Sequence, residues 1–245
     1  MKDGWLSVSE IISFADKPFL LNWARKLALE GKDHNKVSLL GRYAGRIMHY
    51  EFQKKYSEVT EPMGKDLVDA YLDPEAVEHG GLSWGKLQEW AREHFQVIYE
   101  HDPNVFRVEF PIDDEELKVR ARLDCVFNSG YLYDWKSSRH IYAESILELG
   151  AYDYLWNRKF PDTPLCGWTI VQCSHEDESP AQEFKFEESD IKQAGMVFAS
   201  MIPGVRAYKE WEAKAMKLIA GAREPSSIVG DKYGPDGDAR NANWG

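Results

Sequence analysis

Residues 123–136, LDCVFNSGYLYDWK, decide the fold of this chain. Two short apolar runs on either side of a glycine-containing turn predict an antiparallel hairpin. A three-residue turn with Gly130 in the left-handed conformation places Asp124 opposite Asp134. A two-residue turn places Asp124 opposite Trp135 instead and sends the two carboxylates to opposite faces of the sheet. The local pattern allows both registers.

The three-residue register has a chemical consequence. Directly opposed residues of an antiparallel pair lie about 4.5–5.5 Å apart, where two ionised carboxylates repel unless a cation lies between them. Lys136 follows Asp134 by two residues and therefore shares its face. Two acids and a lysine that converge at the end of a hairpin fit the site of a divalent-metal hydrolase. The alternative is a solvent-facing hairpin in which Asp134 forms an ordinary salt bridge with Arg122 or Arg139.

Length and composition predict a single globular domain over residues 1–224 with a flexible C-terminal tail over residues 225–245. The chain has 245 residues, is 43% hydrophobic and contains nine tryptophans. No apolar run is long enough for a membrane span, and no secretion signal is visible. Three cysteines without paired spacing indicate a reducing compartment. We therefore expect a cytoplasmic protein without a membrane partner.

The formal net charge is −11, which argues against a protein that coats nucleic acid indiscriminately. Basic residues nevertheless gather around the hairpin: Lys118, Arg120, Arg122, Lys136 and Arg139. A basic seam in an acidic protein fits a narrow site for a polyanion, and a mixed solvated surface is the alternative.

The periodicity of the rest of the chain predicts an α/β protein in which a mixed central sheet is flanked by helices. Ser7 and Glu10 form a capping box at the start of a short helix, and a second helix begins at Pro18 and stops near Gly31. A further helix carries His49 on one stripe with Gly41 and Gly45. The remaining expected helices are 84–101, 142–158, 189–201 and 204–222, and the expected strands are 105–112, 117–127, 131–136, 167–173 and 184–186.

One apparent nucleotide motif fails. Residues 80–86 match the glycine and lysine spacing of a P-loop, but Leu87 stands where a hydroxyl must reach magnesium. We expect no ATP site.

The order of four motifs resembles the RecB-type branch of the PD-(D/E)XK nuclease superfamily. These motifs are His49, Asp124, residues 134–136 (DWK) and the helix residues Glu148 to Tyr152. The resemblance extends over residues 5 to 160 and is strongest to phage-encoded and mitochondrial-genome-maintenance-type exonucleases. It implies a restriction-endonuclease-like core and a protein of a phage or of a bacterial host cell.

The resemblance also implies roles for individual residues. His49, Asp124, Asp134 and the main-chain carbonyl of Trp135 would bind Mg²⁺ or Mn²⁺. Asp124, Asp134 and Lys136 would be catalytic, with Lys136 orienting or activating water and stabilising charge on the scissile phosphate. The alternative for His49 is a hydrogen-bonded core histidine.

Four further residues are expected at the substrate. Glu148 and Tyr152 would face it from their helix, although two residues four apart also stabilise a helix surface. Arg122 is a third expected contact. Glu109 faces the site only if residues 113–116 form a four-residue loop, and an exposed strand position is the alternative. Trp135, Tyr142 and Tyr152 are candidates for stacking on the bases of a single strand.

The chain departs from the family pattern at Glu148, where glutamine is usual. The added negative charge beside phosphate leaves open whether Glu148 contacts the substrate or a metal. Three cysteines exclude the four-cysteine iron–sulfur cluster of some members. Without a helicase motor, processive action would need a homo-oligomer or a recombination or replication partner protein.

These features predict a metal-dependent DNA exonuclease that acts on duplex ends or single strands in replication, recombination or repair. A structure-specific endonuclease and a catalytically silent DNA-end-binding protein are the alternatives.

Overall fold

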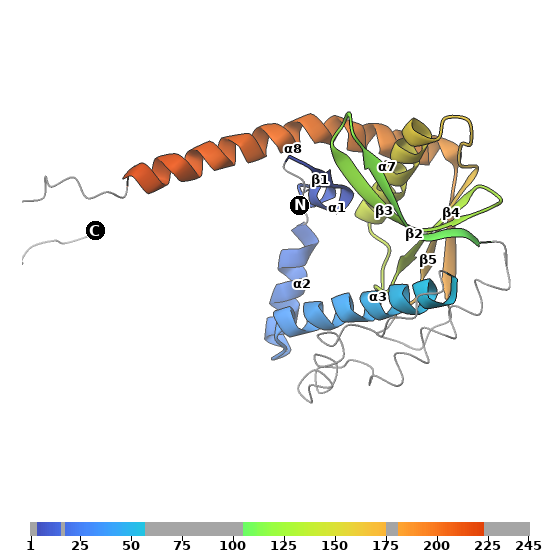
Figure 1. Ribbon diagram of the computed structural model, residues 1–245. Helices are drawn as coiled ribbons and strands as arrows, with labels where there is room; N and C mark the ends of the chain where they lie inside the picture. Colours follow the sequence, from blue (N-terminus) through green and yellow to red (C-terminus); the bar gives the residue numbers. More distant parts are fainter. Residues whose placement is uncertain (1–3, 16–17, 57–104, 175–180, 223–245) are drawn as a thin grey trace, which may run out of the picture. The chain divides into compact units, whose positions relative to one another are not determined.

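The computed structural model describes residues 4–15, 18–56, 105–174 and 181–222 (Figure 1). The chain divides into two compact units, Met1–Ile202 and Pro203–Gly245. The first unit contains the sheet, which is mixed and six-stranded. Its strands are β1 (Leu6–Ser7), β2 (Val105–Asp114), β3 (Val119–Phe127), β4 (Tyr131–Lys136), β5 (Gly167–Gln172) and β6 (Gln182–Phe186).

Strand β3 is the centre of the sheet's connectivity. It pairs antiparallel with β2 and β4 and parallel with β1, while β5 pairs parallel with β4 and antiparallel with β6. The strand β1 is too short to be seen in the sequence pattern, and it joins the sheet beside Val119 and Arg120. The predicted mixed α/β architecture is confirmed.

The register of the β3–β4 hairpin confirms the three-residue turn. Cys125 pairs with Tyr133 and Val126 with Leu132, which places Asp124 opposite Asp134. Gly130 has φ +83°, a conformation that glycine adopts without a steric penalty, and its N–H donates to the Phe127 carbonyl at 3.0 Å. The two-residue alternative is wrong.

The β2–β3 turn differs from the prediction. Strand β2 continues through Asp114, and the loop spans residues 115–118 rather than 113–116. The side chain of Asp114 accepts a hydrogen bond from the Leu117 N–H at 2.8 Å and pairs with Arg158. These contacts hold the acidic residue at the end of the strand, where charge alone suggested a loop. The shifted turn brings Glu109 opposite Asp124, because Val108 pairs with Cys125 and Phe110 with Leu123.

The described helices are α1 (Val8–Ile12), α2 (Pro18–Leu29), α3 (His34–Tyr56), α7 (Ala143–Lys159) and α8 (Glu188–Ala222). Helix α1 starts with the predicted capping box, in which Ser7 Oγ accepts from the Glu10 N–H and Glu10 Oε2 accepts from the Ser7 N–H. The predicted break between residues 201 and 204 is wrong, since α8 continues through Pro203. Proline removes one backbone hydrogen bond, and the Ala- and Lys-rich sequence after it favours a continued helix.

Helices pack on the sheet from several directions. Helix α7 contacts β2 and β3, α3 contacts β2, and α1 packs against α7. Gly150 is required where α7 meets α8, because a Cβ there would lie 2.5 Å from the Ala194 Cβ. The residues Leu123, Leu132 and Ile170 are completely buried and form part of the core between sheet and helices.

Three predictions fall on residues outside the described ranges: the helix 84–101, the rejected P-loop at 80–86 and the tail 225–245. Among the helices that the structure does describe, none combines the length and the apolar character of a membrane span.

Candidate active site

The β3–β4 hairpin places two buried carboxylates side by side. Asp124 is 6% exposed and Asp134 only 1%. Asp124 Oδ2 accepts a hydrogen bond from the main-chain N–H of Trp135 at 2.9 Å. Asp134 Oδ2 lies 2.7 Å from Lys136 Nζ, whereas Asp134 Oδ1 is buried and has no hydrogen-bond donor among the described residues. A buried carboxylate oxygen without a donor is costly unless a cation binds it.

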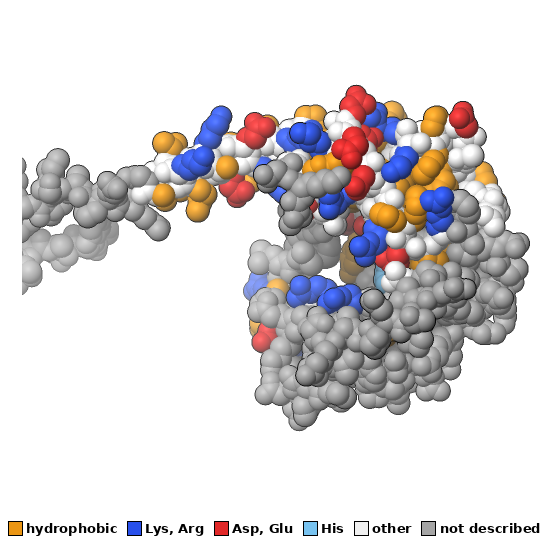
Figure 2. Space-filling model, in the orientation of Figure 1, with side chains coloured by type: hydrophobic (Ala, Val, Ile, Leu, Met, Phe, Trp, Pro, Cys, Tyr) orange, Lys and Arg blue, Asp and Glu red, His pale blue; other side chains and the backbone are white. Residues whose placement is uncertain are grey.

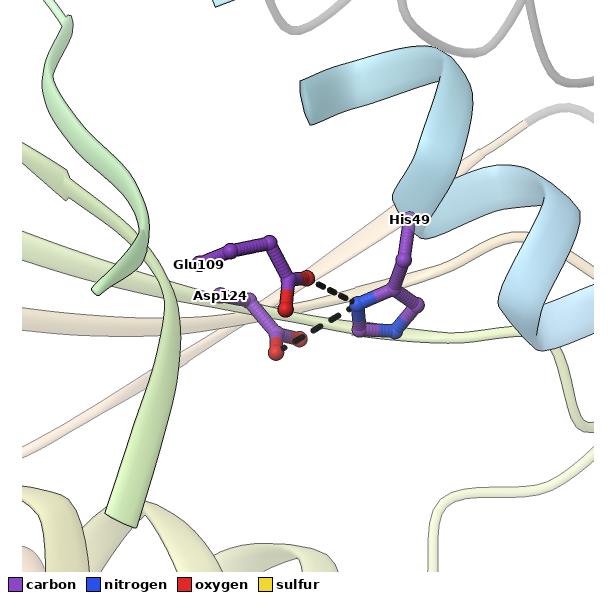
Figure 3. Close-up of side chains that lie close together, drawn as sticks. All are labelled: His49, Glu109 and Asp124. Carbon is purple, nitrogen blue, oxygen red and sulfur yellow. Dashed lines mark hydrogen bonds and ion pairs between the residues drawn. The ribbon is translucent and has the colours of Figure 1, made fainter. Parts of the chain in front are cut away.

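Helix α3 delivers His49 to the same place. His49 Nδ1 lies 2.6 Å from Glu109 Oε1 and 3.6 Å from Asp124 Oδ1 (Figure 3). Glu109 adopts φ +50°, which is unusual for a residue with a side chain and persists only where the surrounding structure enforces it. The strand irregularity therefore aims the Glu109 carboxylate at the histidine.

The residues His49, Glu109 and Asp124 each offer one ligand atom, and these atoms lie within 4.8 Å of one another. Oxygen and imidazole ligands in this arrangement suit a divalent cation. The expected ligand set contained Asp134 in place of Glu109. The structure brings Glu109 into the group, and it leaves Asp134 adjacent to it, with one oxygen at Lys136 and the other without a donor. The main-chain N–H of Trp135 contacts Asp124, which orients that carboxylate.

Lys136 lies between two carboxylates from different elements. Its ammonium is 2.7 Å from Asp134 Oδ2 on its own strand and 2.8 Å from Glu148 Oε2 on α7. The other oxygen of Glu148 accepts a hydrogen bond from the Tyr152 hydroxyl at 2.9 Å. Glu148 is therefore engaged at both oxygens by protein groups, and it faces Lys136 rather than the His49 group.

The electrostatics of the site favour cations throughout. Burial lowers the pKa of His49, but Asp124 and then Glu109 outweigh it and raise this pKa to about 9. Burial raises the pKa of Asp134 well above its usual value despite Lys136, and the neighbouring Asp124 and Glu148 raise it further. The pKa of Lys136 is raised, because Asp134, Glu148 and Asp124 outweigh its burial. Four carboxylates around one ammonium and one imidazole leave a site that attracts positive charge.

A cavity of about 390 Å³ reaches the site at Glu148, whereas Asp124, Asp134 and Lys136 are not among its lining residues. The three expected substrate contacts Arg122, Glu148 and Tyr152 all line it. Arg122 is 72% exposed, and its guanidinium lies 3.7 Å from Glu109 Oε2. The cavity is also lined by Arg120, a member of the predicted basic seam, and by Ser7 and Ser9, which were not among the expected site residues. Arg120, Arg122 and Asp124 alternate along β3 and therefore share one face of the sheet. This two-residue period could have predicted that Arg120 lies near the site.

The three aromatic residues expected to stack on bases have different environments. The side chain of Trp135 is 2% exposed and that of Tyr152 is 5% exposed, so neither offers a free ring face. Trp135 is a core residue, and the stacking expectation for it is wrong. Tyr142 is 38% exposed and forms an edge-to-face pair with His140 at 6.4 Å.

Comparison with known proteins gives little guidance. Neither a protein-family model nor a curated protein sequence matches the chain. One solved structure with a similar fold is that of a putative exonuclease from Eubacterium rectale, with 14% sequence identity and a TM-score of 0.46. The match covers 83% of this chain and 81% of that protein. Similarity this low does not carry an activity from one protein to the other.

Proposed function

We propose that this protein is a metal-dependent nuclease that hydrolyses phosphodiester bonds of DNA, with exonucleolytic action on ends or single strands. The observation that carries the proposal is the buried pair Asp124 and Asp134 beside Lys136 and His49. Two facing carboxylates, one of which has an oxygen without a donor among the described residues, favour a bound cation. Lys136 within 2.7 Å of one of them supplies a positive group for a phosphate.

The residues present fit a hard divalent cation such as Mg²⁺ or Mn²⁺. The side chains that would hold it are His49, Glu109, Asp124 and Asp134, and the Trp135 main-chain carbonyl would complete the set. When bound there, such an ion stabilises the negative charge that develops on phosphate oxygens during hydrolysis. The neutral form of His49 is the ligand form, so binding releases the imidazole proton.

Lys136 acts as a cation in this proposal. Its ammonium contacts two carboxylates, which favour its protonated form. A group held in that form donates hydrogen bonds and does not remove a proton from water. Lys136 therefore orients the attacking water or a phosphate oxygen and stabilises developing charge.

Arg122 is the exposed positive group at the cavity beside this site. Its guanidinium can contact a phosphate there. Glu148 and Tyr152 line the same cavity and contribute a carboxylate and a hydroxyl group to its wall. An exonuclease requires a free DNA end, so the proposal predicts that this protein cleaves linear DNA and leaves closed circles intact.

The test uses end-labelled linear single-stranded DNA and the same sequence as a closed circle, each with Mg²⁺, Mn²⁺ or EDTA. We expect short products from the linear strand only, and only with a metal. Asp134→Asn should reduce the rate at least 100-fold, because it removes the charge of one candidate ligand. The matched control is Asp162→Asn, the same change at an exposed aspartate, which should leave the rate unchanged.

Each outcome has a meaning for the proposal. Rapid cutting of circles identifies an endonuclease instead of an exonuclease. Wild-type rates in Asp134→Asn, or hydrolysis in EDTA, contradict the proposed site. Binding of DNA without turnover under every metal condition supports the catalytically silent end-binding protein.

A further inference from the structure

Positive charge is concentrated in the helix that carries His49. The α3 sequence contains five Lys or Arg residues and one acidic residue, Glu51. The whole chain, by contrast, has a formal net charge of −11. Helix α2, immediately before it, contains two basic residues and no acidic one. Figure 2 shows Lys and Arg side chains along α3 where that helix is not covered. A basic helix in an acidic protein is the electrostatic footprint of a polyanion.

Two of these basic residues share the face of α3 that points to the site. Arg42, Arg46 and His49 lie within about 60° of one another around a helix of 3.6 residues per turn. Both arginines are exposed, and the His49 imidazole reaches Glu109 and Asp124 (Figure 3). At 1.5 Å per residue, Arg46 and Arg42 precede His49 by about 4.5 Å and 10.5 Å along the axis. The two arginines therefore form a row that ends at the candidate metal ligand.

The row also lies next to the segment that follows Lys136. A Cβ on Gly45 would lie 3.3 Å from Ser137 Oγ, so α3 approaches that segment closely between Arg42 and Arg46. The segment itself is held in place, since Ser138 accepts a hydrogen bond from Gln172 Nε2 through its carbonyl at 3.0 Å. The arginines consequently stand at the side of the site where Lys136 leaves β4.

Arg42 and Arg46 differ from other arginines near the site. Arg122 has Glu109 as a neighbour, and Arg158 pairs with Asp114 and Glu116. Among the side chains that the structure describes, neither Arg42 nor Arg46 lies at ion-pair distance from a carboxylate. Two guanidinium groups that are exposed and not neutralised by described neighbours can each bind a phosphate.

We propose that α3 guides a nucleic-acid strand into the site, with Arg42 and Arg46 contacting phosphates of the strand that leads to the scissile bond. This inference rests on the proposed nuclease function and adds the path of the substrate. The contacts are to the backbone, so they are independent of base sequence.

The salt dependence of binding tests this path without turnover. Fluorescence anisotropy measures binding of a fluorescein-labelled 20-nucleotide single strand in EDTA, from 50 to 200 mM KCl. Each lost phosphate contact makes the slope of log K against log salt shallower by about 0.7 on a single strand. For Arg42→Gln with Arg46→Gln we expect a slope shallower by about 1.4 than in the wild type. Arg42→Lys with Arg46→Lys retains both charges and should keep the wild-type slope.

The matched control is Lys214→Gln with Lys217→Gln, two exposed positions on α8 with the same change in net charge. This control should also keep the wild-type slope. Circular dichroism and thermal melting establish that each variant folds, and exposed glutamine is a good helix former.

An unchanged slope in the Arg42 and Arg46 double glutamine variant overturns the inference, and so does an equal change in the α8 control. Either result leaves the nuclease proposal standing, because hydrolysis is judged separately with Asp134→Asn. If the wild type hydrolyses no DNA with Mg²⁺ or Mn²⁺ but the slope still changes, α3 binds nucleic acid and the nuclease proposal fails alone.

Discussion

The Lys136 ammonium lies 2.8 Å from the Glu148 carboxylate, which places a charged partner for the lysine on a second structural element. Its other partner, Asp134, is also a candidate metal ligand. When a divalent ion binds Asp134, that carboxylate is shared between two cations, and their mutual repulsion weakens its hold on the lysine. Glu148 then remains as the group that keeps Lys136 in position.

Glu148→Gln should therefore reduce kcat about 10-fold and leave KM within about twofold. Glutamine keeps the size of the side chain, but the Lys136 ammonium then contacts a neutral amide oxygen instead of a carboxylate, a loss of about 1–1.5 kcal/mol. Tyr152→Phe removes only the hydroxyl that contacts the other oxygen and should have a smaller effect. Steady-state kinetics on a linear oligonucleotide measures both. A wild-type kcat in Glu148→Gln would show that Lys136 does not depend on this carboxylate.

The backbone of Glu109 predicts an unusual order of stability among its variants. At φ +50° a side chain is strained and glycine is not. Glu109→Gly should therefore be more stable than Glu109→Ala by about 1 kcal/mol, or roughly 2–4 °C in Tm. The control is Lys185, an exposed residue of β6. There Lys185→Gly should be less stable than Lys185→Ala, because glycine weakens an ordinary strand. Thermal melting decides the order, and calorimetry with Mn²⁺ should show weaker binding in both Glu109 variants.

Much of the site could be predicted because it depends on short-range counting. The hairpin register follows from the length of one turn. The local pattern limits this length to two or three residues, and the pairing of Cys125 with Tyr133 shows that it is three. The contact of Lys136 with Asp134 follows from the two-residue period of a strand. The position of Glu109 could not be predicted, because it depends on where the β2–β3 turn begins. That turn is fixed by a contact between Asp114 and Arg158, 44 residues apart in the sequence.

The continuity of α8 was also beyond local reasoning. Pro203 predicts a break, and the helix nevertheless runs through it. The opposite error concerned Trp135, whose side chain was expected at the substrate and is buried. Trp135 follows Asp134 in the strand, so its side chain points to the other face of the sheet. The alternation of side chains along the strand could therefore have predicted that Trp135 points away from the site.

The protonation of His49 predicts how the stability of the metal-free protein depends on pH. The pKa of His49 rises from 6.5 to about 9 on folding, so the folded state binds the proton more tightly. This contribution is complete below pH 6.5 and is lost as the pH rises to 9. Even half of the shift is worth about 2 kcal/mol, or roughly 4–8 °C in Tm. Asp134, whose pKa is also raised, contributes with the same sign.

Melting temperatures in EDTA between pH 6 and 9.5 measure this slope. His49→Gln should flatten it, and His140→Gln, the same change at an exposed histidine, should not. With Mg²⁺ we expect the pH dependence of Tm to have the opposite sign. The ion needs the neutral imidazole and therefore stabilises the protein more as the pH rises. Equal slopes in the wild type and in His49→Gln would contradict the assignment of this proton to His49.

The exposed ring of Tyr142 predicts a contact with a base of the substrate strand. Tyr142 precedes α7 directly, is 38% exposed and is braced by His140. Stacking of one base on an aromatic ring contributes about 1–3 kcal/mol, so Tyr142→Ala should weaken binding of a single strand at least fivefold. Tyr142→Phe keeps the ring and should bind like the wild type. Trp135→Ala should instead lower stability by about 3–5 kcal/mol, because it empties a core position. Anisotropy and thermal melting separate the two effects, and unchanged affinity in Tyr142→Ala would exclude stacking at this ring.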